Sequence, residues 1–167
     1  MTKSMTKPAT GTTDPQPLAE AVGRAMYERD HCARAHGIEL EAIGPGYARM
    51  GMTVRPDMVN GHDIGHGGMT FTLADTTFAY ACNADNHATV AAACSIVFPA
   101  PARLGDRLTA ECRVMHQRGR AGVYDTTVTN QEGAVVGLFR GQSMRIQGSV
   151  IQAPVIQESP IQTPPGA

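Results

Sequence analysis

The sequence lacks an excess of charge of either sign, a long apolar run and paired cysteines, and each absence excludes a class of protein. The formal net charge is −1, so the chain as a whole has no attraction for nucleic acid or for anionic membrane surfaces. No apolar run is long enough to cross a bilayer, and the basic N-terminal residues are not followed by the apolar segment of a secretion signal. We therefore expect a cytoplasmic protein with neither nucleic-acid nor membrane partners.

The cysteines are isolated from one another. They form no C-x-x-C pair and are widely spaced, so neither a zinc site nor a disulfide framework is indicated. We expect reduced and mostly buried thiols at Cys32, Cys82, Cys94 and Cys112.

The length and the local composition predict one domain with two tails. Residues 1–16 are rich in Thr, Pro, Lys and Gly without periodicity, so we expect a disordered extension there. Residues 149–167 repeat Ile-Gln at five-residue intervals with prolines between the repeats, which predicts polyproline-like disorder. The folded domain is expected to span residues 17–148.

Hydrophobic periodicity within this domain predicts an α+β fold. Apolar residues recur at helical spacing from Pro17 to about Asp30, and again over residues 66–84, where they surround nearly the whole helix. A helix that is apolar on nearly all sides belongs in a core. Strands are predicted over residues 47–55, 88–98, 107–117, 121–130 and 134–147. The expected architecture is an antiparallel sheet of five or six strands around one long central helix.

The most informative stretch runs from Asn60 to Gly68 and leads into the long predicted helix. Gly67 and Gly68 leave backbone N–H groups approachable at the start of the helix, where the helix dipole adds partial positive charge. A developing oxyanion is stabilised at such a position. Farther along the helix, Asp75 stands alone among apolar neighbours, and a lone acid in that setting indicates a function.

Two other kinds of site fit these residues less well. Three residues have the i, i+1, i+4 spacing of helical metal ligands, namely His62, Asp63 and His66. The glycines before and between them indicate a loop, so we expect no metal site. Cys94 and Ser95 lie in an apolar strand without the G-x-S-x-G context of an activated nucleophile.

Several segments carry a family resemblance when they are taken together. They are Asn60-Gly61-His62, His66-Gly67-Gly68, Leu73-Ala74-Asp75-Thr76, Phe78 to Asn83, Gly122 to Asp125 and Leu138 to Gly141. Together they resemble the hotdog-fold acyl-CoA thioesterases, and most closely those that act on phenylacetyl-CoA. The resemblance covers about residues 18–148. One departure is Gly65, where close relatives carry Cys.

The resemblance implies a fold, an assembly and a reaction. It implies a sheet wrapped around the long helix, pairing of two copies into a dimer, commonly two dimers in a tetramer, and hydrolysis of an aryl-acetyl-CoA thioester without metal or organic cofactor. It assigns polarisation of the thioester carbonyl to the N–H of Gly67. Asp75 is then either the general base toward water or the nucleophile. Hydroxyls of Thr76 and Thr77 are candidates for contacts to its carboxylate.

The other residues of the predicted site shape the loop and bind the substrate. Asn60 orders the loop or binds water, unless it serves only in an Asn-Gly turn. His66 caps or aims the loop so that the Gly67 amide points correctly, with general-base use as the alternative. Substrate contacts are expected from Gly68, Thr76, Met58, Val59 and Ile64 and, for the CoA phosphates, from Arg118 and Arg120, with Arg103 a further candidate.

Helix geometry adds a constraint on the predicted site. Gly67 and Asp75 are eight residues apart. This spacing separates them by about 12 Å along one helix, too far for both to act on one carbonyl. If both are catalytic, the Asp75 that serves a given Gly67 comes from another subunit, and the dimer has antiparallel central helices.

Two alternative functions follow from the same residues. One is a hotdog thioesterase for another aryl- or medium-chain acyl-CoA. The other is a non-hydrolytic or hydratase-type hotdog protein that binds acyl-CoA. A hydratase is expected to carry His five residues after its catalytic Asp, and Tyr80 occupies that position here, which favours hydrolysis.

Overall fold

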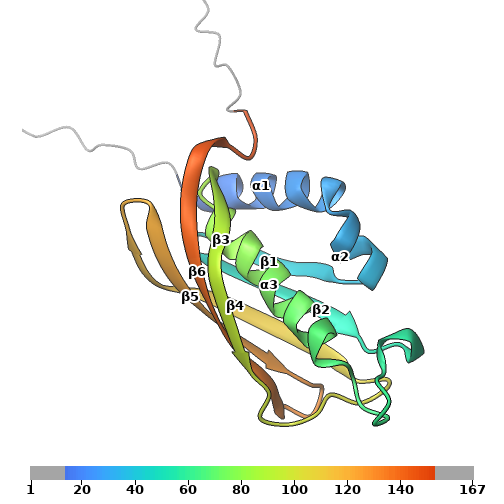
Figure 1. Ribbon diagram of the computed structural model, residues 1–167. Helices are drawn as coiled ribbons and strands as arrows, with labels where there is room; N and C mark the ends of the chain where they lie inside the picture. The colour runs from blue at the N-terminus through green and yellow to red at the C-terminus, as the bar shows by residue number, and fades with distance from the viewer. Residues whose placement is uncertain (1–13, 153–167) are drawn as a thin grey trace, which may run out of the picture.

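The computed structural model describes residues 14–152, in which one antiparallel sheet lies against a long helix (Figure 1). The strand order across the sheet is β1-β2-β4-β5-β6-β3. The strands are β1 (Glu39–Gly44), β2 (Tyr47–Thr53), β3 (His87–Val97), β4 (Arg107–Arg118), β5 (Ala121–Thr129) and β6 (Val135–Ser149). The helices are α1 (Gln16–Arg29), α2 (His31–His36) and α3 (Gly67–Asn83), with a 3₁₀ turn, η1 (Pro56–Met58). This confirms the predicted α+β arrangement.

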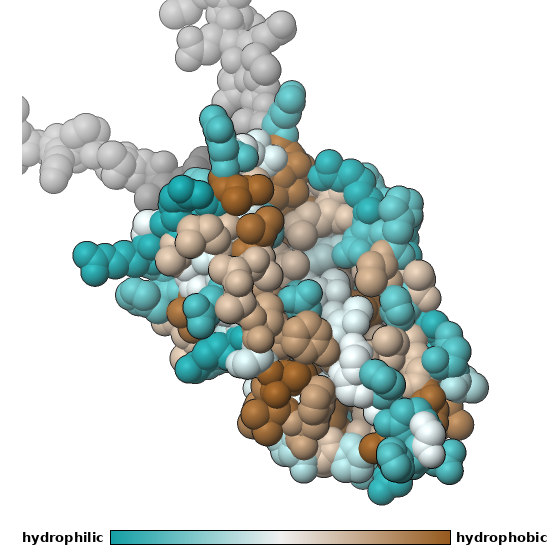
Figure 2. Space-filling model, in the orientation of Figure 1, coloured by the Kyte–Doolittle hydropathy of each residue, from teal (hydrophilic) through white to brown (hydrophobic). Residues whose placement is uncertain are grey.

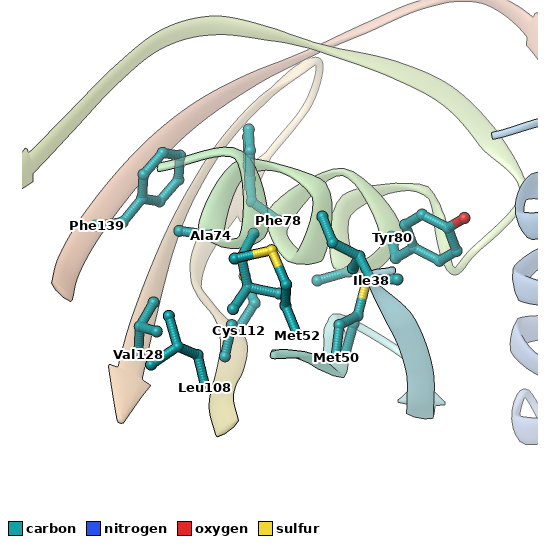
Figure 3. Close-up of a cluster of buried hydrophobic side chains, with 14 of the residues drawn as sticks. Ile38, Met50, Met52, Ala74, Phe78, Tyr80, Leu108, Cys112, Val128 and Phe139 are labelled. Carbon is teal, nitrogen blue, oxygen red and sulfur yellow. The ribbon is translucent and has the colours of Figure 1, made fainter. Parts of the chain in front are cut away.

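Helix α3 forms the centre of the core because it packs against every strand of the sheet. Its buried side chains include Leu73, Phe78 and Tyr80, which is why the helix is apolar on most sides. The ring of Phe78 contacts those of Tyr124 and Phe139 at centroid separations of 5.4 and 5.8 Å. Figure 3 shows Phe78 and Phe139 among the apolar side chains that lie between helix and sheet.

Tight turns join β4, β5 and β6, which are neighbours both in sequence and in the sheet. Hairpins connect β4 to β5 and β5 to β6, and Gly119 and Gly133 in these loops have φ values of 56° and 81°. Glycine adopts this left-handed conformation without the steric cost that other residues meet. Each predicted strand boundary lies within two residues of the observed one.

The sequence interpretation missed two short elements at the N-terminal side. Helix α1 has Pro17 in its first turn, as predicted, but Asp30 both ends α1 and caps α2 by accepting a hydrogen bond from the Ala33 N–H at 2.8 Å. Strand β1 was not predicted because it is a short edge strand that carries charged residues on alternate positions. Both of its charged residues, Glu39 and Glu41, pair with Arg107 on β4.

Strand β3 is an edge of the sheet and is largely exposed. It pairs only with β6 among the described strands, and its middle is the apolar run Ala91–Ala93. The register shifts between Ala91 and Ala93, so this strand contains a β-bulge. Figure 2 shows tan and brown surface over this part of the molecule.

The ends of the described chain bear on the predicted tails. Most of the two predicted tails, residues 1–13 and 153–167, lies outside the described residues. Just inside the C-terminal limit, Asn86 holds Ile151 by two hydrogen bonds of 2.9 and 3.0 Å. The contacts of the domain therefore reach three residues beyond the predicted boundary at 148.

The structure also bears on the state of the cysteines and on membrane spans. The four cysteines are free; Cys82 and Cys112 are buried, Cys94 is half-buried and Cys32 is exposed. The prediction of mostly buried thiols is wrong for Cys32, because α2 lies at the surface. None of the helices in residues 14–152 has the length and hydropathy of a membrane span.

Candidate active site

The loop before α3 is folded by the side chain and backbone of Asn60. Its Oδ1 accepts a hydrogen bond from the His62 N–H at 2.9 Å, and its own N–H donates to the Ile64 carbonyl at 2.8 Å. Asp63 completes the turn with a φ of 56°. The Nδ2 amide makes no hydrogen bond within the described chain, and Asn60 is one of the residues that line the pocket described below. Asn60 therefore forms the turn and lines the site.

His66 caps α3 and sets the direction of its first N–H groups. The His66 Nδ1 accepts a hydrogen bond from the Gly68 N–H at 2.9 Å. Within the described chain the neighbouring Gly67 N–H has no hydrogen-bond partner. A bare N–H at the positive end of a helix is suited to bind a partial negative charge.

A pocket of about 420 Å³ opens at this end of α3. It is lined by Asn60, Ile64, Gly65, Gly67, Thr70, Phe98, Pro99, Ala100, Pro101, Ala102 and Val136. Most of these side chains are apolar, so the pocket suits an apolar group with one polarised atom near Gly67. The sequence interpretation missed that segment 98–102 lines the pocket, because a Pro-Ala-Pro stretch between strands predicts only a turn.

Segment 98–102 explains why glycines occur at two positions of the pocket. A Cβ on Gly67 would lie 3.1 Å from the Phe98 ring. A Cβ on Gly65 would lie 3.1 Å from the Ala102 Cβ, and the Gly65 N–H donates to the Ala102 carbonyl at 2.8 Å. The Gly65 departure from the family pattern thus coincides with a close approach of this segment.

Asp75 lies near the middle of α3 and is half-buried. Its Oδ1 accepts a hydrogen bond from the Cys94 thiol at 3.6 Å, and it forms no ion pair within residues 14–152. Burial raises the pKa of the Asp75 carboxyl above its usual value, and the Cys94 hydrogen bond partly opposes that rise. A carboxyl whose pKa is raised by burial is typical of an acid that takes part in proton transfer.

Neither of the two candidate donors to Asp75, Thr76 and Thr77, donates to its carboxylate in the described chain. The Thr77 hydroxyl donates to the Leu73 carbonyl at 2.7 Å, one turn back along the helix. Thr76 is half-exposed on the same side of α3 as Asp75 and makes no side-chain hydrogen bond within the described chain. The contacting group is instead Cys94, which comes from β3.

The remaining predicted contacts fall in different places. Ile64 lines the pocket. Met58 is 2% exposed within the hydrophobic core and Val59 packs against that core, so Met58 and Val59 do not line the pocket. This corrects their predicted placement: η1 turns Met58 inward. Gly68 serves the cap, because a Cβ there would lie 2.9 Å from the His66 Nδ1.

Arg118 and Arg120 flank the β4–β5 turn, far from the pocket of the same chain. The pocket lies near Val136, at the end of the sheet where Thr109 pairs with Thr129. Nine residues of β4 separate Thr109 from Arg118, which is about 30 Å of strand. The Arg120 Nε donates to the Arg145 carbonyl at 2.9 Å, at the end where α3 finishes.

The structure also places the residues considered for a metal site and, at position 80, for a hydratase. Within residues 14–152 no group of three His, Cys, Asp or Glu side chains is arranged to hold a metal ion. The Tyr80 ring is fully buried and its hydroxyl donates to Asp30 at 3.3 Å, on the side of α3 that faces α1. It therefore takes no part in the surroundings of Asp75.

The chain is similar to known thioesterases over most of the described residues. A family model described as the thioesterase superfamily matches residues 62–136. The acyl-coenzyme A thioesterase PaaI of Escherichia coli K12 is 51% identical over 126 residues, which are 75% of this chain and 90% of that protein. A solved structure of E. coli PaaI, from the phenylacetic acid degradation operon, aligns with a TM-score of 0.80 at 48% identity, covering 81% of this chain and 99% of that one. A hypothetical thioesterase of Streptococcus pneumoniae, solved with coenzyme A, aligns with a TM-score of 0.69 at 25% identity, covering 74% and 98%.

Proposed function

This chain belongs to the thioesterase superfamily as a hotdog-fold homologue of PaaI, and we propose that it hydrolyses phenylacetyl-CoA, or a ring-hydroxylated phenylacetyl-CoA, to the free acid and coenzyme A. The observation that carries the proposal is the unpaired N–H of Gly67, which lies at the positive end of α3 in the wall of an apolar pocket. The aromatic ring of Phe98 beside Gly67 supports an aryl group as the occupant.

The proposed chemistry uses Gly67 to polarise the thioester and Asp75 to supply the attack. With Asp75 as general base, its carboxylate takes a proton from water, and the water oxygen attacks the carbonyl carbon. The tetrahedral intermediate then breaks its C–S bond, and the departing thiolate takes up the proton. With Asp75 as nucleophile, a carboxylate oxygen displaces the thiolate, and water hydrolyses the resulting mixed anhydride. Both courses require ionised Asp75.

We propose that the two groups of one site come from two subunits. Asp75 does not line the pocket that contains Gly67, and about 12 Å of helix separates the two residues within one chain. If a second copy packs with its α3 antiparallel to the first, its Asp75 approaches the Gly67 of this chain. The same two-fold axis then builds two equivalent sites.

The exposed side of β3 and α3 supports this dimer. Strand β3 is a long apolar edge whose outer side pairs with no other strand of residues 14–152, and such an edge is a template for pairing with a second strand. Beside it, α3 presents a half-exposed stripe at helical spacing that contains Asp75: Gly68, Thr72, Asp75, Thr76 and Ala79. Packing of two dimers into a tetramer stays a prediction, which light scattering on the purified protein measures.

The dimer also changes the interpretation of the two hairpin arginines. Antiparallel helices bring the end of α3 in one copy beside the start of α3 in the other. Arg118 and Arg120 lie near Arg145, at the end of the sheet where α3 finishes. Any contact they make with CoA phosphates is therefore across the dimer, to substrate bound at the partner's pocket. The location in the cytoplasm also stays a prediction; the four free cysteines fit a reducing compartment.

A panel of acyl-CoA thioesters tests the function, with the released CoA thiol measured by a colorimetric thiol reagent. We expect phenylacetyl-CoA and its ring-hydroxylated forms to have the highest kcat/KM, above benzoyl-CoA and medium-chain alkyl thioesters. Asp75→Asn protein is the matched control, since it keeps the shape of the site. Highest kcat/KM with an alkyl thioester would contradict the proposed substrate. Binding of acyl-CoA without thiol release by the unmodified protein would contradict hydrolysis itself.

A further inference from the structure

The edge strand β3 brings a thiol to the carboxylate on which the proposed reaction depends. The Cys94 Sγ lies 3.6 Å from the Asp75 Oδ1, a separation that suits the large sulfur atom as a donor. The two residues are 19 positions apart in the sequence and come from different elements. Within residues 14–152 this is the one side-chain hydrogen bond that Asp75 makes.

A β-bulge aims Cys94 at the helix. Ala91 pairs with Ser143, which faces α3, so strict alternation would turn Ala93 and Ser95 toward the helix as well. The register shift between Ala91 and Ala93 reverses this, and Cys94 pairs instead with the inward-facing Gly141. Because of the bulge, the thiol of Cys94 contacts Asp75, in place of the methyl group of Ala93 or the hydroxyl of Ser95.

Gly141 lets helix and sheet approach closely at this point. A Cβ on Gly141 would lie 2.8 Å from the ring of Phe78, which is 1% exposed and fixed in the core. Phe78 is three residues after Asp75 on α3. Because Gly141 is directly opposite Cys94, the same contact that seats Phe78 also brings the thiol within reach of the carboxylate.

None of the threonine hydroxyls on α3 donates to Asp75 in the described chain, and that of Thr76 makes no hydrogen bond there. Thr72 and Thr77 donate to helix carbonyls one turn back, at 2.8 and 2.7 Å. Hydroxyls that bond within the helix do not orient a carboxylate on its surface. Cys94 is thus the side chain that fixes the direction of the Asp75 oxygens in the described chain.

We infer that Cys94 is a positioning residue for Asp75, and that its thiol holds the carboxylate oriented for attack on the thioester. This inference rests on the proposed function, in which Asp75 is the reacting group. Burial and the neighbouring Asp75 raise the pKa of Cys94 to about 11, so the sulfur keeps its proton at neutral pH and donates. The hydrogen bond stabilises the ionised carboxylate, the form that both courses of the reaction require.

No other titratable group competes with Cys94 for this role in the described chain. The others on α3 and on the inner face of the sheet are Tyr80, Cys82, Cys112 and Tyr124, and the pKa of Asp75 responds to burial and Cys94 rather than to these. The charged groups near the end of α3 pair among themselves: Asp85 with His87 and Arg145. Arg140 pairs with Asp125 on the outer face.

Two substitutions at Cys94 test the inference, with the pH profile of kcat as the readout. Cys94→Ala removes the donor, so the pKa of Asp75 rises, the acid limb of the profile moves to higher pH, and the maximal kcat falls roughly tenfold. Cys94→Ser restores a donor and brings the limb back toward its original pH. Cys32→Ala is the matched cysteine control and leaves the profile unchanged, because Cys32 is exposed on α2.

A measurement independent of hydrolysis follows the carboxyl group itself. Protein labelled with ¹³C at the aspartate carboxyl carbon is titrated by NMR, and the Asp75 resonance is assigned by its loss in Asp75→Asn. We expect a higher midpoint in Cys94→Ala and a return toward the original midpoint in Cys94→Ser. An unchanged midpoint in Cys94→Ala overturns the inference. A shifted midpoint in a protein that hydrolyses no thioester of the panel overturns the proposed function alone and leaves the contact standing.

Discussion

A mixture of two inactive variants should recover activity if each site draws its groups from two subunits. Asp75→Asn removes the carboxylate and should lower turnover by a factor of ~10²–10⁴, since an amide acts neither as base nor as nucleophile. Gly67→Pro removes the N–H that polarises the carbonyl, and proline is acceptable in the first turn of a helix. Neither homodimer then contains a complete site.

The surroundings of Gly67 determine the control for this experiment. A Cβ at Gly67 would lie 3.1 Å from the Phe98 ring, so proline presses on that ring as well as removing the N–H. Phe98 is 47% exposed and can turn toward solvent. Gly67→Ala meets the same ring but keeps the N–H, so the difference between the two variants isolates the contribution of the donor.

The expected recovery follows from the two-fold symmetry of the proposed dimer. Random reassortment of equal amounts makes about half of the dimers mixed. In each mixed dimer one site combines the intact Gly67 of one chain with the intact Asp75 of the other, and the second site carries both defects. The mixture should therefore show about a quarter of wild-type activity. If both groups acted within one chain, no site in the mixture would be complete.

The assay is thiol release from phenylacetyl-CoA by chains that carry different affinity tags. Co-expression and purification over both tags isolate the mixed dimers, which should have about half of the wild-type activity per dimer. Circular dichroism of each homodimer checks that the variants fold. Doubly tagged, folded dimers with activity no higher than either homodimer would refute the argument from helix spacing.

Three further predictions concern pH, packing and the C-terminal residues. The kcat should rise with pH through the pKa of Asp75, which burial sets above the usual carboxyl range, and a pH–rate profile with no acid limb there would contradict a role for ionised Asp75. Gly141→Ala should lower the free energy of unfolding by about 1–3 kcal/mol, because its Cβ would lie 2.8 Å from the buried Phe78 ring; Gly61→Ala, with open space around it, is the control in urea unfolding. Deleting residues 153–167 should leave hydrolysis and oligomeric state within about twofold, since Pro-rich sequence contributes little to a core, and dissociation to monomers on a sizing column would contradict this.

The sequence predicts most of the fold because the main elements are long and regular. Apolar residues surround most of α3, and apolar and polar residues alternate along the strands; both are local patterns, and the structure has the elements that they predict. Strand β1 escapes prediction because its glutamates disfavour a strand, and their pairing with Arg107 depends on β4, more than sixty residues away. Helix α2 is missed because six residues are too few for a periodic pattern.

The site is predictable where it is local and unpredictable where it is assembled. The glycines and the His66 cap at the start of α3 are adjacent in sequence, so the bare N–H of Gly67 could be foreseen. The Phe98 wall and the contact of Cys94 with Asp75 could not, because each joins segments brought together by the sheet. The contact of Cys94 with Asp75 depends on a one-residue bulge in β3, and no local sequence pattern predicts that bulge.

The same strand links the proposed assembly to the ionisation of Asp75. Pairing of β3 with a second copy would cover the exposed side of α3, and further burial raises the pKa of a carboxyl. Taken alone, the association that completes the site would therefore favour the protonated acid, which acts neither as base nor as nucleophile. The Cys94 thiol opposes this effect from the strand that makes the contact, because it donates to the ionised form. A donor that is itself uncharged at neutral pH does so without adding a buried charge to the interface.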